Sequence, residues 1–169
     1  QSATGTDIAA ADAYKVVVNG NRAYVTNKTA GTVTIVDTAT NNIVKTVAAG
    51  TNPDGIAVSP DGSQIYVTSS LNNTITVVNT ATGAKTRTVT INNPTAIGIS
   101  PSGQTLYVTS GKDGTLVKIT TVFWNSAAIK LPAGSTPTGL VVSPDISNIY
   151  VISTTAPGGN ISSVGAAAY

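Results

Sequence analysis

The sequence predicts an all-β protein assembled from repeated antiparallel sheets. Two observations indicate this fold class: the apolar residues are mostly Val, Ile and Ala, and one motif returns every 41 to 43 residues. Hydrophobic residues make up 41% of the 169-residue chain and aromatic residues only 5%, while Thr, Ser, Asn and Gly fill most of the rest. This composition favours short strands and tight turns. Helices are disfavoured because Glu and Met are absent and Leu is scarce.

The repeated motif is centred on a tyrosine. An apolar residue, Tyr and Val occur together four times, at Tyr24, Tyr66, Tyr107 and Tyr150. The last three copies are each preceded by a small, apolar run that ends in Ser-Pro, at residues 55–60, 97–101 and 139–144. A period of this length is typical of folds in which one supersecondary unit is stacked on the next.

The second unit shows most clearly how the strands are arranged. It predicts strands at residues 55–59, 65–69, 74–78 and 85–91. In the first turn, Pro60 fixes φ and Gly62 supplies a positive φ. The first strand is small and apolar, whereas the fourth alternates Thr with Lys85 and Arg87, so we expect burial to decrease from the first strand to the fourth. Four short antiparallel strands in about 40–45 residues are typical of a β-propeller blade.

We therefore expect a β-propeller-like array of about four four-stranded antiparallel blades, with the last blade incomplete in the chain. The last unit has strands at residues 139–143 and 149–153, a weak third strand at 160–164 and no fourth. We divide the chain into an N-terminal segment, residues 1–13, and the propeller-like units, residues 14–169. The N-terminal segment contains a strand-like stretch that completes a blade or is donated to a neighbour, formed by Thr6, Asp7, Ile8, Ala9 and Ala10.

Four arrangements are compatible with this pattern. They are a closed four-bladed ring, a polymer linked by strand donation, an eight-bladed ring of two chains, and a fragment of a larger ring. Each makes about the same number of strand hydrogen bonds, worth roughly 1 kcal/mol apiece, so strand energy does not choose among them. The first residue is Gln1 rather than Met, so we expect a processed chain or a fragment.

The repeat resembles the YVTN-type β-propeller family. Tyr24-Val25-Thr26-Asn27 is the tetrapeptide for which that family is named, and residues 59–68 and 76–83 follow its pattern. The resemblance covers residues 14–165. It implies a surface-layer or other exported protein, commonly with seven blades. Seven blades need about 300 residues at this period, so this chain departs from the family in length.

The residue content excludes most catalytic sites. The chain has no His, Cys or Glu, which removes Ser–His triads, Cys–His dyads, disulfides and the usual zinc sites. Among the seven Asp, Asp61 and Asp145 are expected in turns, and Asp37 and Asp54 as local caps. We expect no catalytic residues, no cofactor and no bound metal. A weak calcium site at Asp54 or Asp113 is the alternative.

Charge and hydropathy indicate which partners to expect. Only 9% of residues are charged, the net charge is +2, and the basic residues are scattered along the chain. We therefore expect no nucleic-acid partner. No apolar run approaches the ~20 residues that a membrane span needs.

Two surface features are candidate sites. Asn27, Asn72 and Asn160 each begin an N-x-[ST] sequon, which predicts glycosylation if the sequons do not arise by chance in a chain rich in Asn and Thr. Phe123 and Trp124 are the only Phe and Trp, and they lie where other units have a polar turn. They form either a contact patch for a partner or sugar, or a cover for the blade edge.

These observations support three hypotheses about function. The first is an extracellular or cell-surface structural protein that self-associates, as a homo-oligomer or polymer, through strand pairing or blade edges. The second is a monomeric propeller module that binds proteins or glycans through Phe123 and Trp124. The third, which the residue content disfavours, is a lactonase-like propeller enzyme.

Overall fold

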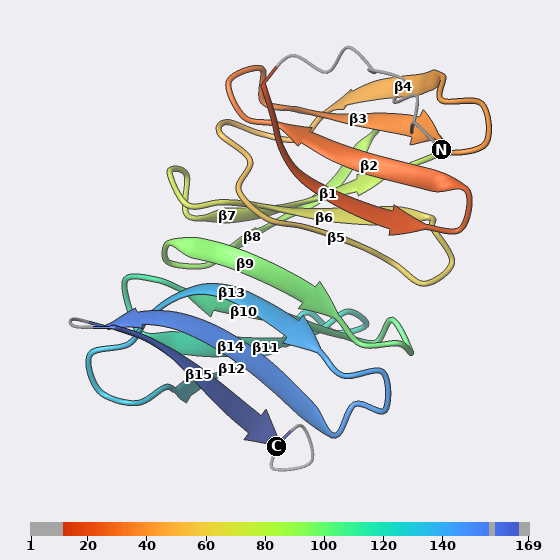
Figure 1. Cartoon of the computed structure of the whole chain (residues 1–169). Helices are drawn as coiled ribbons and strands as arrows, with labels where there is room; N and C mark the ends of the chain where they lie inside the picture. The colour runs from red at the N-terminus through yellow and green to blue at the C-terminus, as the bar shows by residue number, and fades with distance from the viewer. Residues whose placement is uncertain (1–11, 156–157, 166–169) are drawn as a thin grey trace, which may run out of the picture.

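The computed structural model describes residues 12–155 and 158–165. These residues form fifteen strands in four antiparallel sheets, stacked one on the next as blades (Figure 1). The predicted all-β array of four blades is confirmed. The expected strand-exchange segment, residues 6–10, lies outside the described residues. The described part of the chain holds no apolar helix of membrane-spanning length.

Each blade is a meander in which strands consecutive in sequence are neighbours in the sheet. Blade 1 contains β1 (Ala13–Asn19), β2 (Arg22–Asn27), β3 (Thr32–Asp37) and β4 (Ile43–Ala48). Blade 2 contains β5 (Ile56–Val58), β6 (Gln64–Ser69), β7 (Thr74–Asn79) and β8 (Lys85–Thr90). Blade 3 contains β9 (Pro94–Ile99), β10 (Thr105–Ser110), β11 (Thr115–Thr120) and β12 (Ser126–Lys130). Blade 4 contains β13 (Thr136–Val142), β14 (Asn148–Thr155) and β15 (Gly158–Gly165).

The described part of blade 4 is a three-stranded sheet, in agreement with the weak last unit of the sequence. Its third strand, β15, pairs with β14 over eight residues, which is longer than the third strand of any other blade. In blades 1 to 3 the third strand has a fourth strand on its outer side, whereas β15 is the outermost strand described in its sheet.

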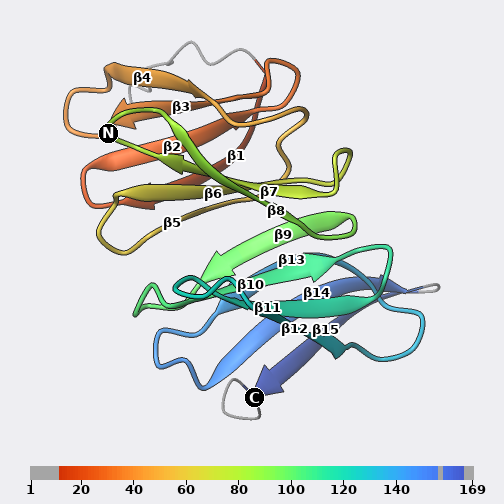
Figure 2. The ribbon, with the colours of Figure 1, turned by 180° about the vertical axis from the view of Figure 1, so that it is seen from behind.

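The predicted decrease of burial from the first strand to the fourth holds in blade 2, whereas the first strand of blade 1, β1, is mostly exposed. In blade 2 the first strand, β5, is buried throughout, and the fourth strand, β8, is almost fully exposed. The first strands of successive blades contact one another, β1 with β5, β5 with β9 and β9 with β13. Together they line a hollow of about 160 Å³. Both views place blades 1 and 4 at opposite ends of the stack (Figure 1, Figure 2).

The blades pack through the alternating side chains of their second strands. In β6, Ile65 and Val67 point towards blade 1, while Tyr66 between them points towards blade 3. Tyr24 and Tyr107 take the same position in blades 1 and 3, and each is buried against the following blade. Since side chains alternate with a period of two along a strand, one strand supplies apolar side chains to the interfaces on both sides.

Acidic turns join the first two strands of blades 2 and 4. Asp61 accepts hydrogen bonds from Ser59 Oγ at 2.5 Å and from Ser63 N at 3.0 Å. Asp145 likewise accepts from Ser147 N at 3.0 Å and from Ser147 Oγ at 2.8 Å. Hydrogen bonds from Ser59 and Ser63 lower the pKa of Asp61 to about 2, and those from Ser143 and Ser147 lower the pKa of Asp145 to about 2. The prediction that both are turn residues is confirmed.

We expect Asp61 to stabilise the fold only while it is ionised. A group whose pKa is lowered by folding stabilises above its unfolded-state pKa, and that contribution is lost as the pH falls through the folded-state pKa. Asp61→Asn should therefore melt below the wild type at pH 7, by no more than a few degrees because the group is exposed and screened by solvent. The difference should shrink between about pH 4 and pH 2, where the wild-type carboxyl is protonated. Thermal melts followed by circular dichroism measure this, and a constant difference across that range would contradict it.

Candidate functional site

The outer sides of blades 1 and 4 carry exposed apolar side chains. The residues at the equivalent positions between neighbouring blades are buried. At an interior interface, the face of one blade that bears Tyr66 packs against the face of the next blade that bears Leu106 and Val108. Tyr66 is 3% exposed in that position, and burial raises the pKa of its hydroxyl. Blade 1 has a face of the aliphatic kind directed away from blade 2. Blade 4 has a face of the tyrosine-bearing kind directed away from blade 3.

The leading face is the side of blade 1 directed away from blade 2. Its exposed members are Val16, Val18 and Ile43, and Ala23 and Val25 are half-buried. Strand pairing places them on one side of the sheet, because Val16 lies opposite Val25 and Val18 lies opposite Ala23. Thr34 and Val36, which pair with Val25 and Ala23 on the same side of the sheet, are buried. Val16 and Val18 are 64% and 60% exposed, whereas Ile56 and Val58, the equivalent residues of blade 2, are buried against blade 1.

The trailing face is the side of blade 4 directed away from blade 3. It consists of Val141, Tyr150, Ile152 and Ile161, all exposed. Cross-strand pairing aligns Val141 with Tyr150 and Ile152 with Ile161. Tyr150 is 42% exposed, although the tyrosine at this position of the other three blades is buried.

Ile152 makes the trailing face more apolar than its counterparts. The equivalent residue of the first three blades is a threonine, Thr26, Thr68 or Thr109. Its hydroxyl accepts a hydrogen bond from a backbone N–H in the first strand or, in blade 2, just before it, at 3.0, 2.7 and 3.0 Å. Blade 4 replaces this polar contact with an isoleucine that is 53% exposed. None of the residues that define the leading and trailing faces carries a charge, so covering either face would desolvate no ionised side chain.

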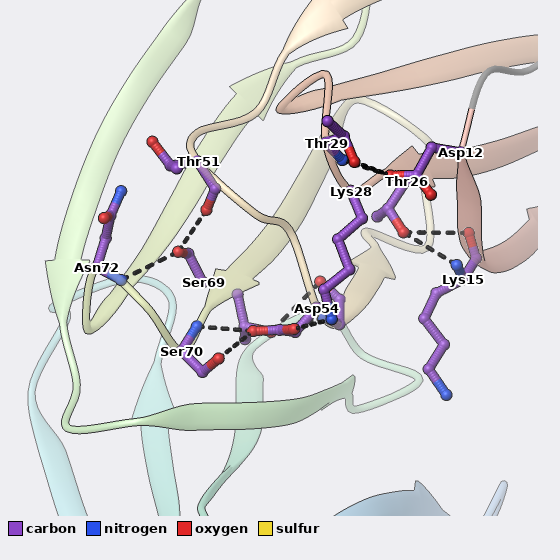
Figure 3. A network of polar contacts seen from close by, with 12 residues as sticks. Asp12, Lys15, Thr26, Lys28, Thr29, Thr51, Asp54, Ser69, Ser70 and Asn72 are labelled. Atoms are coloured by element: carbon purple, nitrogen blue, oxygen red, sulfur yellow. Dashed lines mark hydrogen bonds and ion pairs between the residues drawn. The ribbon is translucent and has the colours of Figure 1, made fainter.

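A buried carboxylate joins blade 1 to blade 2 (Figure 3). Asp54, in the connection between the blades, accepts a hydrogen bond from Ser70 N at 2.8 Å and another from Ser70 Oγ. Its other oxygen lies 3.0 Å from Lys28 Nζ, whose pKa is raised chiefly by its hydrogen bond with Asp54. Lys28 also lies over the ring of Tyr14, 3.9 Å from its centroid. The sequence predicts a local cap at Asp54, and the structure adds a contact between blades.

The structure separates the two aromatic residues of the predicted contact patch. Trp124, with φ of 59°, folds back onto blade 2, where Arg87 lies 4.8 Å from its ring centroid and Tyr66 lies 6.5 Å from it, centroid to centroid. Trp124 thus covers a blade edge, which is one of the two predicted alternatives. Phe123 is 81% exposed beside the exposed Val122, so the outer patch consists of this pair.

The three sequon asparagines differ in accessibility. Asn27 is buried, and its Nδ2 donates hydrogen bonds to Thr32 Oγ1 at 2.9 Å and Thr34 Oγ1 at 2.8 Å. A glycan on Asn27 would require that both bonds break. Asn72 is exposed in the turn between β6 and β7, and Asn160 is exposed within β15. Asn27 aligns with the buried Ser69 and Ser110, so alignment of the repeats gives a signal that this position is buried.

The described carboxylates are engaged in local contacts. Besides the three already described, Asp12 bonds Thr29, Asp37 bonds Arg22, and Asp113 accepts from Asn92 Nδ2 at 2.7 Å. Within residues 12–155 and 158–165, no three acidic side chains gather as a metal site would require.

The sequence did not reveal the leading and trailing faces. The repeat places the same residue types in blades that have a neighbour on both sides and in blades 1 and 4, so the pattern does not tell exposed positions from buried ones.

Comparison with known proteins identifies the family. A family model described as YNCE-like beta-propeller matches residues 2–106. The chain belongs to the YNCE-like β-propeller family. Its finer resemblance to YVTN-repeat surface-layer proteins stays a prediction. No curated protein matches the sequence.

Two solved structures superpose on most of this YNCE-like chain. Hydrazine synthase from Kuenenia stuttgartiensis aligns with a TM-score of 0.86 and 22% identity, over 99% of this chain and 50% of that one. The β-propeller domain of Cps50 (Swd1) from Myceliophteria thermophila aligns with a TM-score of 0.77 and 14% identity, over 95% of this chain and 54% of that one. At these identities the likeness establishes the fold alone, and the chain spans about half the length of each structure.

We expect Asp54→Ala to destabilise the contact between blades 1 and 2. The change leaves the half-buried Ser70 N–H without its acceptor and removes the partner of Lys28, which should cost about 1–3 kcal/mol in the free energy of unfolding. Urea denaturation followed by circular dichroism measures the loss. Asp113→Ala is the matched control: Asp113 also accepts two side-chain hydrogen bonds but is exposed, so its loss should be smaller. Equal losses for the two variants would contradict the proposed contact.

Proposed function

We propose that this chain is a structural propeller module that self-associates as part of an extracellular or cell-surface assembly. The observation that carries the proposal is the exposure of two uncharged apolar faces, one at each end of the blade stack. Large contiguous apolar patches on a protein surface usually mark a site that binds a partner. The resemblance of the repeat to exported YVTN-type proteins supports the surface location.

A structural role also fits the engagement of the carboxylates. Every Asp of the described residues accepts hydrogen bonds from neighbouring Ser, Thr, Asn, Arg or backbone groups, which holds turns and blade contacts in place. A general acid or base needs a carboxyl group placed to exchange a proton with a substrate. Carboxyl groups held in local hydrogen bonds suit the structural role that we propose, which needs no catalytic group.

The assembly can be tested by measuring the mass of the purified chain in solution. Multi-angle light scattering after size-exclusion chromatography should give a mass above that of one chain at micromolar concentrations and above. Ile161→Lys should lower this mass, because it places a charge on the trailing face, where Ile161 is 75% exposed. Leu71→Lys is the matched control, since Leu71 is 67% exposed in a turn outside both faces. A wild-type mass equal to one chain at all concentrations would refute self-association.

A second function is favoured by the exposed pair Val122 and Phe123. Such an apolar tip on an outer turn could dock on a protein or on the apolar face of a sugar. Phe123→Ala should abolish binding to immobilised glycans or protein partners, and it should leave the melting temperature unchanged because Phe123 is 81% exposed. Trp124→Ala should instead lower the melting temperature, because it removes the packing against Arg87 and Tyr66. Glycan-array binding that is indifferent to Phe123→Ala would remove this function.

A further inference from the structure

We propose that a pocket between blades 1 and 2 binds a small aromatic molecule, in the place that the side chain of Trp124 takes between blades 2 and 3. This inter-blade pocket has a volume of about 650 Å³. Both interfaces lie inside the stack, so the proposal does not depend on the outer sides of blades 1 and 4. It is also independent of the proposed self-association, because the ligand is not a second copy of the chain.

The inter-blade pocket has the size and the lining of a small-molecule site. Its wall in blade 1 combines apolar side chains with two cations, and includes Arg22, Tyr24, Ile35, Val44 and Lys45. Two turns of blade 2, at residues 60–62 and 80–81, form the opposite wall. Small-molecule sites typically have volumes of about 300–1,000 Å³, with an apolar lining and a few polar groups that orient the ligand. The pocket therefore has room for a ring with a polar substituent.

Blades 1 and 2 carry the same row of side chains towards the blade that follows each of them. In both, a tyrosine, an aliphatic residue and a cation are aligned across the second, third and fourth strands. The rows consist of Tyr24, Ile35 and Lys45 in blade 1 and of Tyr66, Val77 and Arg87 in blade 2. In blade 3 the fourth-strand residue of the row is Ala127, so that blade does not repeat the pattern.

Between blades 2 and 3, the ring of Trp124 covers this row. Its centroid lies 4.8 Å from Arg87 Cζ and 6.5 Å from the centroid of Tyr66. A cation over an indole face and a tilted pair of aromatic rings are both favourable contacts. The pocket that remains at this interface has a volume of about 400 Å³, and its lining includes Tyr66 but neither Val77 nor Arg87. The chain itself thus shows which group the row accepts.

The counterpart of Trp124 in blade 2 is Gly83, which has no side chain. The N–H of Gly83 donates to Asn79 O at 2.8 Å, and φ is 76°. The N–H of Trp124 donates to Thr120 O at 2.8 Å, and φ is 59°. A Cβ on Gly83 would lie 3.7 Å from Lys45 Cδ and 3.9 Å from Lys45 Nζ. A side chain at this position would therefore extend towards the cation of the row, and the glycine leaves that place to a ligand.

Two donors of the inter-blade pocket indicate what the ring should carry. No hydrogen bond joins the Tyr24 hydroxyl to a residue of the described ranges, whereas the Tyr66 hydroxyl donates to Gln64 Oε1 at 2.9 Å. Lys45 Nζ donates to Ala81 O at 2.6 Å, and an ammonium group has two further hydrogens to donate. The ligand that fits therefore carries an acceptor, such as a carboxylate, beside its ring.

The other charges of the lining have partners in the chain. Arg22 is paired with Asp37, and Asp61 accepts hydrogen bonds within its own turn. Lys45 forms no ion pair with a carboxylate of the described residues. Its charge is therefore the one that a carboxylate on the ligand can neutralise.

The first test is a titration of the wild-type chain with indole-3-acetate, followed by two-dimensional amide NMR. We expect saturable shifts at the amides of Lys45, Ala81 and Gly83, with a dissociation constant of roughly 1 mM or below for a ligand of this size. Cyclohexane-acetate has the same carboxylate on a ring without π-faces, so it should bind at least fivefold more weakly. Absence of saturable shifts at these amides, or equal affinity for the two acids, would overturn the proposal.

The second test closes the inter-blade pocket with a side chain. Gly83→Trp supplies the ring from the chain and should abolish the shifts caused by indole-3-acetate. Its Cβ would lie 3.1 Å from Val47 Cγ1, so circular dichroism must verify the fold. Lys45→Ala adds no new contact and is the second variant, for which the dissociation constant should rise at least fivefold. Binding of wild-type strength to both folded variants would overturn the assignment of the pocket.

The third test opens the equivalent site at the next interface. Trp124→Gly uncovers Arg87, so indole-3-acetate should cause a second set of saturable shifts there, in addition to those of the wild type. Indole alone should also raise the melting temperature of this variant more than that of the wild type, because it refills the space that Trp124 leaves. Shifts at Arg87 that are the same with and without Trp124 would show that the ring does not mark the ligand's place, and would overturn the proposal.

Discussion

The packing of blade on blade through alternating side chains is the constraint on which the rest of the structure depends. A strand with a two-residue period presents one set of side chains to each neighbouring sheet. In β6 of blade 2, Tyr66 packs against blade 3, whereas Ile65 and Val67 pack against blade 1. A shift of one residue in register would exchange these sets and place the tyrosine where the preceding blade has no space for it. The same alternation decides which side chains each blade presents to its neighbours on either side.

Most of the fold could be predicted from the sequence because its signals are local. The spacing of the tyrosines, the Ser-Pro turns and the β-branched strands locate the four sheets, and the alternation around Tyr66 determines the interfaces that it joins. What escaped prediction depends on distant contacts. Trp124 folds back onto Arg87 through a backbone with φ of 59°, which its local sequence does not indicate. Asn27 is buried and donates hydrogen bonds to Thr32 and Thr34, although its sequon alone suggests an accessible site.

The end faces illustrate a limit that is general for repeat proteins. Val16 and Val18 follow the same pattern as Ile56 and Val58, yet one pair is exposed and the other is buried. The pattern reports what a residue is suited to contact, and only the arrangement of the blades shows whether the contact is made. Ile152 is the exception, since it departs from the threonine of the other blades and so marks the trailing face within the sequence itself.

The succession of contacts, each blade touching the one before and the one after, also bears on how the molecule opens. A linear stack of units with nearest-neighbour coupling behaves as a one-dimensional cooperative system, in which the end units have one coupling and the interior units have two. The amide hydrogens of blades 2 and 3 would then exchange with solvent more slowly than those of blades 1 and 4. Local opening should therefore begin at a terminal sheet, which breaks only one coupling when it separates, rather than within blade 2 or blade 3.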